Sequence, residues 1–198
     1  MGGQNEQTPE RTPALSDRAT LLCPVASRPL GLAAAVTVDG TAFVAKAEHH
    51  ITVFGASVGR LLLAAFKDDP ALRGRIDART RAMGWSWRRR GLWYRLARDE
   101  PKPLTTIIEL VEAPIARFYA AVAGDVDAAR FPELAAVLAS PPPPHVTLYT
   151  SDPAGAAGIG LHRAADLDEA LERARTAAPG EPRLRAYALA GPPVDGAT

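Results

Sequence analysis

Residues 145–150 read His-Val-Thr-Leu-Tyr-Thr and follow a run of four prolines, Pro141 to Pro144. The prolines predict a stiff, extended connector, and the β-branched and aromatic residues behind them predict a strand. In a strand, residues two places apart point to the same face. His145 and Thr147 therefore share one face, and the aliphatic residues between and after them are expected on the buried face.

The same pattern occurs 95 residues earlier, where residues 50–53 read His-Ile-Thr-Val. His50 and Thr52 again share a face. Strict alternation adds an aromatic residue to that face in each copy, Phe54 in the first and Tyr149 in the second. We take these two rings as candidate substrate-binding residues that stack on a base, the alternative being that they belong to the core.

Two imidazoles and two hydroxyls suit phosphodiester chemistry if the two copies face one another. One neutral imidazole takes a proton while a protonated one gives a proton, since an unperturbed His titrates near pH ~6.5. The threonine hydroxyls donate hydrogen bonds to the non-bridging oxygens of a phosphate. Water or a ribose hydroxyl would attack, so this chemistry needs neither a nucleophilic side chain nor a metal.

The two His-x-Thr-x tetrads resemble those of the 2H phosphoesterase superfamily, which includes bacterial RNA 2′,3′-cyclic phosphodiesterases, also called 2′-5′ RNA ligases. The resemblance covers about residues 28 to 190. It implies a bilobal, pseudo-twofold α+β fold, with mostly antiparallel sheets lining a central cleft and helices packed outside. It also implies His50 and His145 as the acid–base pair and Thr52 and Thr147 as the phosphate donors.

By this resemblance the chain is expected to be an enzyme that acts on 2′,3′-cyclic or 2′-5′ phosphodiester bonds of RNA ends or small nucleotides, without a cofactor or metal. The alternative is a non-catalytic RNA- or nucleotide-binding module on the same scaffold. The direction of the reaction and the choice of acid and base stay open. His49 is expected on the opposite strand face from His50, so a zinc site formed by His49, His50 and His145 is not expected, and His162 is expected to be solvated.

The chain has 198 residues, of which 47% are apolar, enough for one domain with a substantial core. We expect a disordered leader at residues 1–20, one bilobal domain at 21–190 and a tail at 191–198. A lone cysteine, Cys23, excludes an internal disulfide. The longest apolar run is far shorter than the ~20 residues of a membrane span. These features predict a cytoplasmic monomer with no obligate protein partner.

Charge is distributed unevenly. Residues 73–98 contain nine arginines, a single acid, Asp77, and all three tryptophans. A basic stretch interleaved with aromatic residues suits RNA binding, whereas the alternative places the tryptophans in the core and the arginines on a solvated strand face. Within this segment a turn at Arg90-Gly91 is expected to separate two strand-like runs.

The remaining pattern mixes strands and helices without regular alternation, which predicts the α+β class with a mostly antiparallel sheet. Asp39-Gly40 predicts a hairpin turn within residues 36–44. Further elements are expected at these places: a strand at 51–54, a helix from Ser57 that ends before Pro70, strands at 104–111 and 184–189, and helices near Pro114, behind Pro132 and from Asp166. The glycine-rich residues 155–160 are expected to form a flexible loop.

Overall fold

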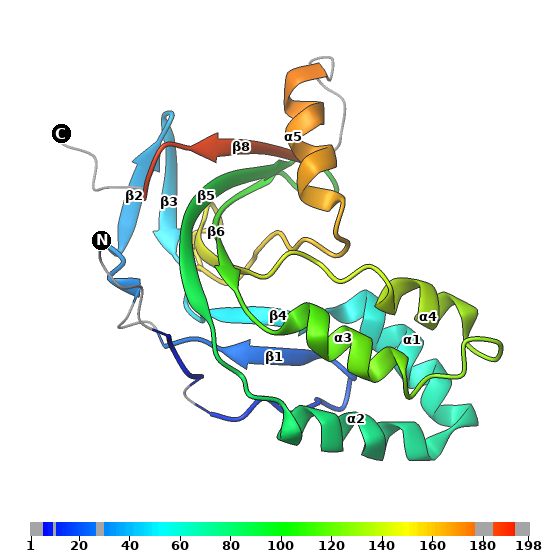
Figure 1. Cartoon of the computed structure of the whole chain (residues 1–198). Helices are drawn as coiled ribbons and strands as arrows, with labels where there is room; N and C mark the ends of the chain where they lie inside the picture. The colour runs from blue at the N-terminus through cyan, green and yellow to red at the C-terminus, as the bar shows by residue number, and fades with distance from the viewer. Residues whose placement is uncertain (1–5, 10, 27–29, 177–183, 193–198) are drawn as a thin grey trace.

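The structure is a computed structural model that describes residues 6–9, 11–26, 30–176 and 184–192. In this part of the chain the strands join one antiparallel sheet with helices on both faces, which confirms the expected α+β class (Figure 1). The strands are β1 (Leu21–Pro24), β2 (Ala35–Val38), β3 (Thr41–Ala45), β4 (His50–Phe54), β5 (Arg88–Arg98), β6 (Leu104–Glu112), β7 (His145–Thr150) and β8 (Arg185–Leu189). The helices are α1 (Ala56–Asp68), α2 (Pro70–Ala82), α3 (Ile115–Ala123), α4 (Pro132–Leu138) and α5 (Asp166–Thr176).

The sheet brings the two copies of the tetrad side by side. Its strand order is β1-β4-β7-β6-β5-β8, and β3 also pairs with β7 while β2 pairs with β3. The tetrad strands β4 and β7 are therefore direct neighbours in one continuous sheet. The β2–β3 hairpin turns at Asp39 and Gly40, both with positive φ (49° and 74°), as a tight hairpin turn requires.

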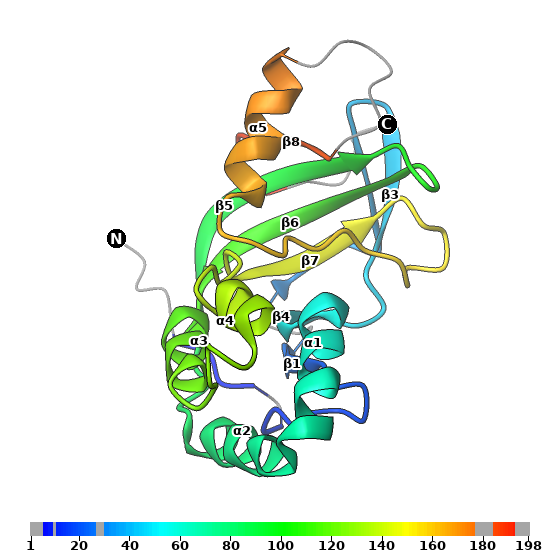
Figure 2. The same cartoon turned by 90° about the vertical axis from the view of Figure 1, so that its right-hand side faces the viewer.

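Two hydrophobic clusters lie on opposite faces of this sheet. The larger one joins β1 and β4 to helices α1 to α4, and the smaller one joins β5, β6 and β8 to α5. Figure 2 shows α5 alone on its side of β5 and β6, away from the other helices. Alternation along β6 separates the clusters, since Ile107 and Val111 belong to the larger and Ile108 and Leu110 to the smaller.

The arginine-rich segment forms the helix α2 and then the strand β5. All three tryptophans are buried, with exposed fractions of 7%, 2% and 5% for Trp85, Trp87 and Trp93, so they are core residues. The prediction that a turn at Arg90-Gly91 separates two strands is wrong, because residues 88–98 form one strand. Gly91 instead adopts φ +66° at a register shift within the single strand β5, and the backbone therefore continues through a bulge.

The expectation of a disordered leader at residues 1–20 is wrong for the described residues 11–20. Leu15 and Ala19 are buried in the larger cluster, and Leu15 pairs with Leu21. This segment also lies tightly against α1, because a Cβ on Gly59 would come within 2.6 Å of the Arg18 carbonyl oxygen. Residues 1–5 of the expected leader and 193–198 of the expected tail lie outside the described residues. No helix in the described ranges is both long and apolar enough to cross a bilayer.

Candidate functional site: a pocket lined by both tetrads

The register of β4 and β7 places the two tetrads side by side on one face of the sheet. Ile51 pairs with Val146 in the antiparallel ladder. Continuing that register by one residue in each direction sets His50 opposite Thr147 and Thr52 opposite His145. Side chains directly opposite one another have Cβ atoms about 5 Å apart, and diagonal neighbours are about 7–8 Å apart. The two imidazoles therefore occupy one diagonal of a square and the two hydroxyls the other.

All four tetrad side chains line one pocket of about 200 Å³, here called the histidine pocket. The structure thus brings together the residues that the shared strand faces predict. The rest of the lining comes from the chain between β3 and β4 and from the loop after β7: Lys46, Glu48, Ala156, Gly158, Ile159 and Gly160.

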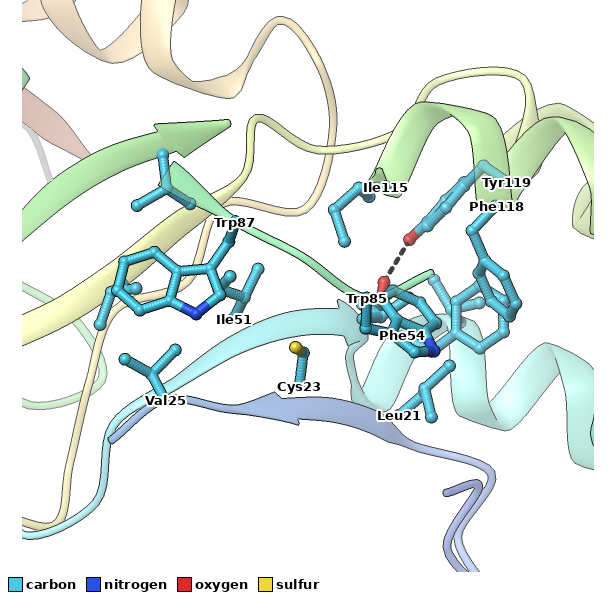
Figure 3. Packing of buried hydrophobic residues seen from close by; sticks show 14 of the residues in the cluster. Leu21, Cys23, Val25, Ile51, Phe54, Trp85, Trp87, Ile115, Phe118 and Tyr119 are labelled. Atoms are coloured by element: carbon cyan, nitrogen blue, oxygen red, sulfur yellow. Dashed lines mark hydrogen bonds between the residues drawn. The ribbon is translucent and has the colours of Figure 1, made fainter. Parts of the chain in front are cut away.

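The prediction that Phe54 and Tyr149 stack on a substrate base is wrong. Both rings are fully buried, at 0% and 1% exposure, and neither lines the histidine pocket. Phe54 packs against Phe118 and Tyr119, with ring centroids 5.4 and 5.3 Å apart (Figure 3). The two aromatic residues therefore belong to the core, which was the alternative reading.

A β-bulge after each threonine explains this outcome. Thr52 and Phe54 lie opposite Leu22 and Leu21 of β1, so that Val53 is an extra residue in β4. In β7, Leu148 is extra in the same way, because Thr147 and Tyr149 lie opposite two consecutive residues of β6. One extra residue reverses the alternation and turns the next side chain to the other face.

Both bulges are tied into the structure by hydrogen bonds. The hydroxyl of Tyr119 donates to the carbonyl oxygen of Val53 at 2.8 Å, and the backbone N–H of Lys46 donates to that of Leu148 at 2.9 Å. Each carbonyl that leaves the regular ladder thus keeps a donor, as buried backbone oxygens require.

His145 is the more enclosed of the two imidazoles, with 5% of its surface exposed. Its Nδ1 lies 2.8 Å from the carbonyl oxygen of Pro143, which accepts a hydrogen bond when Nδ1 carries a proton. The neutral ring then has its lone pair on Nε2. Burial lowers the pKa of His145, and the nearby His162 and His50 lower it further, against the opposing effect of the Pro143 carbonyl.

His50 is partly exposed and has a polar neighbourhood. Burial and the ammonium group of Lys46 lower its pKa, whereas the carboxylate of Glu48 raises it. Lys46 and Glu48 occupy a short excursion at residues 46–49, where the chain leaves β7 after Ala45 and returns to it at Ile51. The excursion brings a cation and an anion to the edge of the histidine pocket.

Sequence reasoning did not identify Lys46 as a site residue. Its Nζ donates hydrogen bonds to the carbonyl oxygens of Ala156 and Ala157, and it lies near Gly158 at the pocket. Burial lowers its pKa, while the carboxylates of Asp152 and Glu48 raise it. Its only signal in the sequence is that lysine is rare here, with three in the whole chain.

The loop at residues 155–160, expected to be flexible, is instead tied down over the histidine pocket. The Asp152 carboxylate accepts hydrogen bonds from the backbone of Ala156 and Ala157 at 3.1 and 2.7 Å. Gly155 adopts φ +66°, and a Cβ there would lie 3.0 Å from the Ala45 carbonyl oxygen, so a larger residue would not fit without movement.

The other two histidines, His49 and His162, do not line the histidine pocket. His49 is buried, and His162 is exposed, as expected. A Cβ on Gly160 would approach the His162 ring within 3.4 Å, which places that ring beside the loop. Across the described residues, no group of three or more His, Cys, Asp or Glu side chains is arranged to hold a metal ion.

The arginines between 73 and 98 are largely paired within the protein. Five of the nine form ion pairs: Arg75 with Asp69, Arg79 with Asp125, Arg88 with Glu112, Arg89 with Glu109 and Arg95 with Asp39. The guanidinium of Arg89 lies 2.8 Å from the carboxylate of Glu109, whose side chain is only 1% exposed. The same guanidinium lies over the ring of Trp93. Much of this charge is therefore neutralised in place, which weakens the interpretation of the segment as an RNA-binding surface.

Comparisons of this chain with protein-family models, with curated proteins and with solved structures each found no match. Its function therefore has to be inferred from the chemistry of the histidine pocket itself.

Proposed function

We propose that this protein is a metal-independent phosphodiesterase of the 2H type, which hydrolyses 2′,3′-cyclic or 2′-5′ phosphodiester bonds of RNA ends or small nucleotides. The observation that carries the proposal is the square of His50, Thr147, His145 and Thr52 around one pocket. His50 and His145 lie on a diagonal of this square, so a phosphate bound in the pocket would have one imidazole on either side.

The surroundings of the two histidines suggest which is the base. A general base must be neutral before the reaction, and the enclosure of His145 disfavours its charged form. The bond to Pro143 fixes its ring with Nε2 free to accept a proton. His50 is more exposed and has Glu48 nearby, so it is more easily protonated and suits the acid role.

In this mechanism, His145 removes a proton from a water molecule as its oxygen attacks phosphorus. A new P–O bond forms, the bond to one ribose oxygen breaks, and His50 gives its proton to that leaving oxygen. The product is a phosphomonoester. The hydroxyls of Thr52 and Thr147 donate to the non-bridging oxygens, and the ammonium group of Lys46 offsets the negative charge that gathers there.

The residues that line the histidine pocket all come from one chain, and we expect the enzyme to act as a monomer. We also place it in the cytoplasm, since Cys23 is a buried free thiol, as is usual in a reducing compartment.

The test is a panel of 2′,3′-cyclic mononucleotides and 2′-5′ dinucleotides, assayed with and without EDTA and with the position of the product phosphate determined. We expect turnover that survives EDTA and is lost in the double variant His50→Ala/His145→Ala. Arg60→Ala is the control, because Arg60 is an exposed residue of α1 that does not line the histidine pocket. Binding without turnover in the unaltered protein would instead favour the non-catalytic binding module.

A further inference from the structure

A second pocket shares a wall with the histidine pocket. It has a volume of about 550 Å³, and its lining includes Glu48 and His50, which also line the histidine pocket. The other lining residues come from the N-terminal segment, β1 and the excursion: Arg11, Leu22, Pro24, Val25, Ala47 and His49. We call this space the shelf pocket. The two pockets therefore adjoin at Glu48 and His50.

The apolar surface of the shelf pocket is an extension of the tetrad face. Leu22 of β1 lies opposite Thr52 and Pro24 lies opposite His50, so these side chains share the face of the tetrad. Leu22 is 39% exposed, and Leu92 is the other large apolar side chain with such exposure among the described residues. An exposed apolar residue beside a polar reaction site is suited to contact the organic part of a substrate.

The histidine pocket alone is small for a nucleotide. Its volume of about 200 Å³ is below the ~300–1,000 Å³ usual for pockets that enclose a whole organic ligand. A phosphate held between the imidazoles would therefore have its sugar and base outside, and the shelf pocket is the adjoining space on the His50 side.

We propose that the shelf pocket is the nucleoside subsite of this protein, with the base lying on Leu22 and Pro24 and Arg11 binding a further phosphate of the same strand. This inference rests on the proposed function and extends it, because it makes the end of an oligonucleotide the preferred substrate. Glu48, in the shared wall, is placed to accept a hydrogen bond from a ribose hydroxyl or a base amino group. Arg11 is the cation of this pocket, and its guanidinium suits a phosphate partner.

Calorimetric binding of three probes tests the subsite without requiring turnover: inorganic phosphate, 2′-AMP and adenosine 2′,5′-bisphosphate. We expect 2′-AMP to bind at least about tenfold more tightly than phosphate, and the bisphosphate to bind more tightly again with a steeper salt dependence. Leu22→Gln, which adds no negative charge beside Thr52, should abolish the gain from the nucleoside while leaving phosphate binding unchanged. Arg11→Ala should abolish only the gain from the second phosphate.

Matched controls exist for both variants. Leu92→Gln makes the same change at an equally exposed strand leucine on β5, and Arg60→Ala removes an exposed arginine from α1; neither residue lines the two pockets. Neither control should change the binding of any probe. If Leu22→Gln lowers the melting temperature, Leu22→Thr replaces it at the same position.

The outcomes separate the two proposals. If phosphate binds but 2′-AMP gains nothing over it, the nucleoside subsite is wrong while the phosphate site stands. An equal loss of all three probes in a folded Leu22 variant also overturns the subsite. If none of the probes binds to the unaltered protein, the phosphate site, and the proposed function with it, is wrong.

Discussion

The two copies of the tetrad have the same residue pattern but different surroundings. His145 follows four prolines and is 5% exposed, with its Nδ1 beside the Pro143 carbonyl oxygen. His50 follows a polar excursion, is partly exposed and has Lys46 and Glu48 as neighbours. The comparison teaches that a repeated motif supplies equivalent chemical groups in different local environments, and in the proposed mechanism this difference favours His145 as the base and His50 as the acid.

The largest effect is expected from removing either histidine, and it should reveal this asymmetry. His50→Ala and His145→Ala should each lower the rate by roughly 10²–10⁴ on a cyclic phosphate. On a p-nitrophenyl diester, whose leaving group needs no proton, the loss in His50→Ala should largely disappear, while that in His145→Ala should remain. Steady-state rates of both variants on the two substrates measure this.

Two results would contradict the assignment. The reverse pattern of rescue would exchange the roles of the two histidines. Full activity of either variant on every substrate would overturn the two-histidine mechanism. The double variant should cost less than the product of the single losses, because the pair acts as a unit.

The two bulges predict the next largest effect, on stability. Phe54→Ala and Tyr149→Ala should each lower the free energy of unfolding by about 3–5 kcal/mol, because each removes a fully buried ring. Chemical denaturation measures this. In the milder variant Phe54→Leu, the KM for a nucleotide substrate should stay unchanged. A raised KM at unchanged stability would restore the base-stacking interpretation for that copy.

Replacing either threonine is expected to have a smaller effect on the rate than replacing a histidine, and a similar effect in both copies. Thr52→Val and Thr147→Val should each slow catalysis roughly 10- to 100-fold, since each loses one hydroxyl donor to the phosphate, worth about 1–3 kcal/mol. Serine at either position should retain most of the activity. Thr37→Val, at an exposed site in the β2–β3 hairpin, is the control that should change nothing. A loss confined to one threonine would show that only one copy contacts the phosphate.

The smallest effect concerns protonation. The pKa values of His50 and His145 both lie below the usual 6.5 in the folded protein. At a pH between these lowered values and 6.5, the unfolded chain therefore binds more protons than the folded protein does. The free energy of unfolding should therefore fall as the pH falls through this window, and less so in His145→Gln. NMR titration should place both transitions below 6.5, and bound phosphate should raise both. A transition above 6.5 without ligand would contradict the environments described above.

Most of the elements were predictable because they depend on local pattern. The period of two gave the tetrad strands and their polar faces, and the period near four gave α1. Helix α2 was not predicted, because its buried residues Leu72, Ile76 and Thr80 are few among charged neighbours. Its stability comes from packing against the rest of the core, which no local pattern records.

The sequence by itself determined the fold class, the two tetrads and which of their side chains share a face, since strand geometry links neighbours two residues apart. Only the tertiary structure decided the rest. The β4–β7 pairing joins segments 95 residues apart, and the bulges at Val53 and Leu148 depend on the strands paired beside them. Lys46 and the loop over the pocket likewise meet only after folding. Register, bulges and burial arise from contacts between distant segments, and these contacts have no periodicity along the chain.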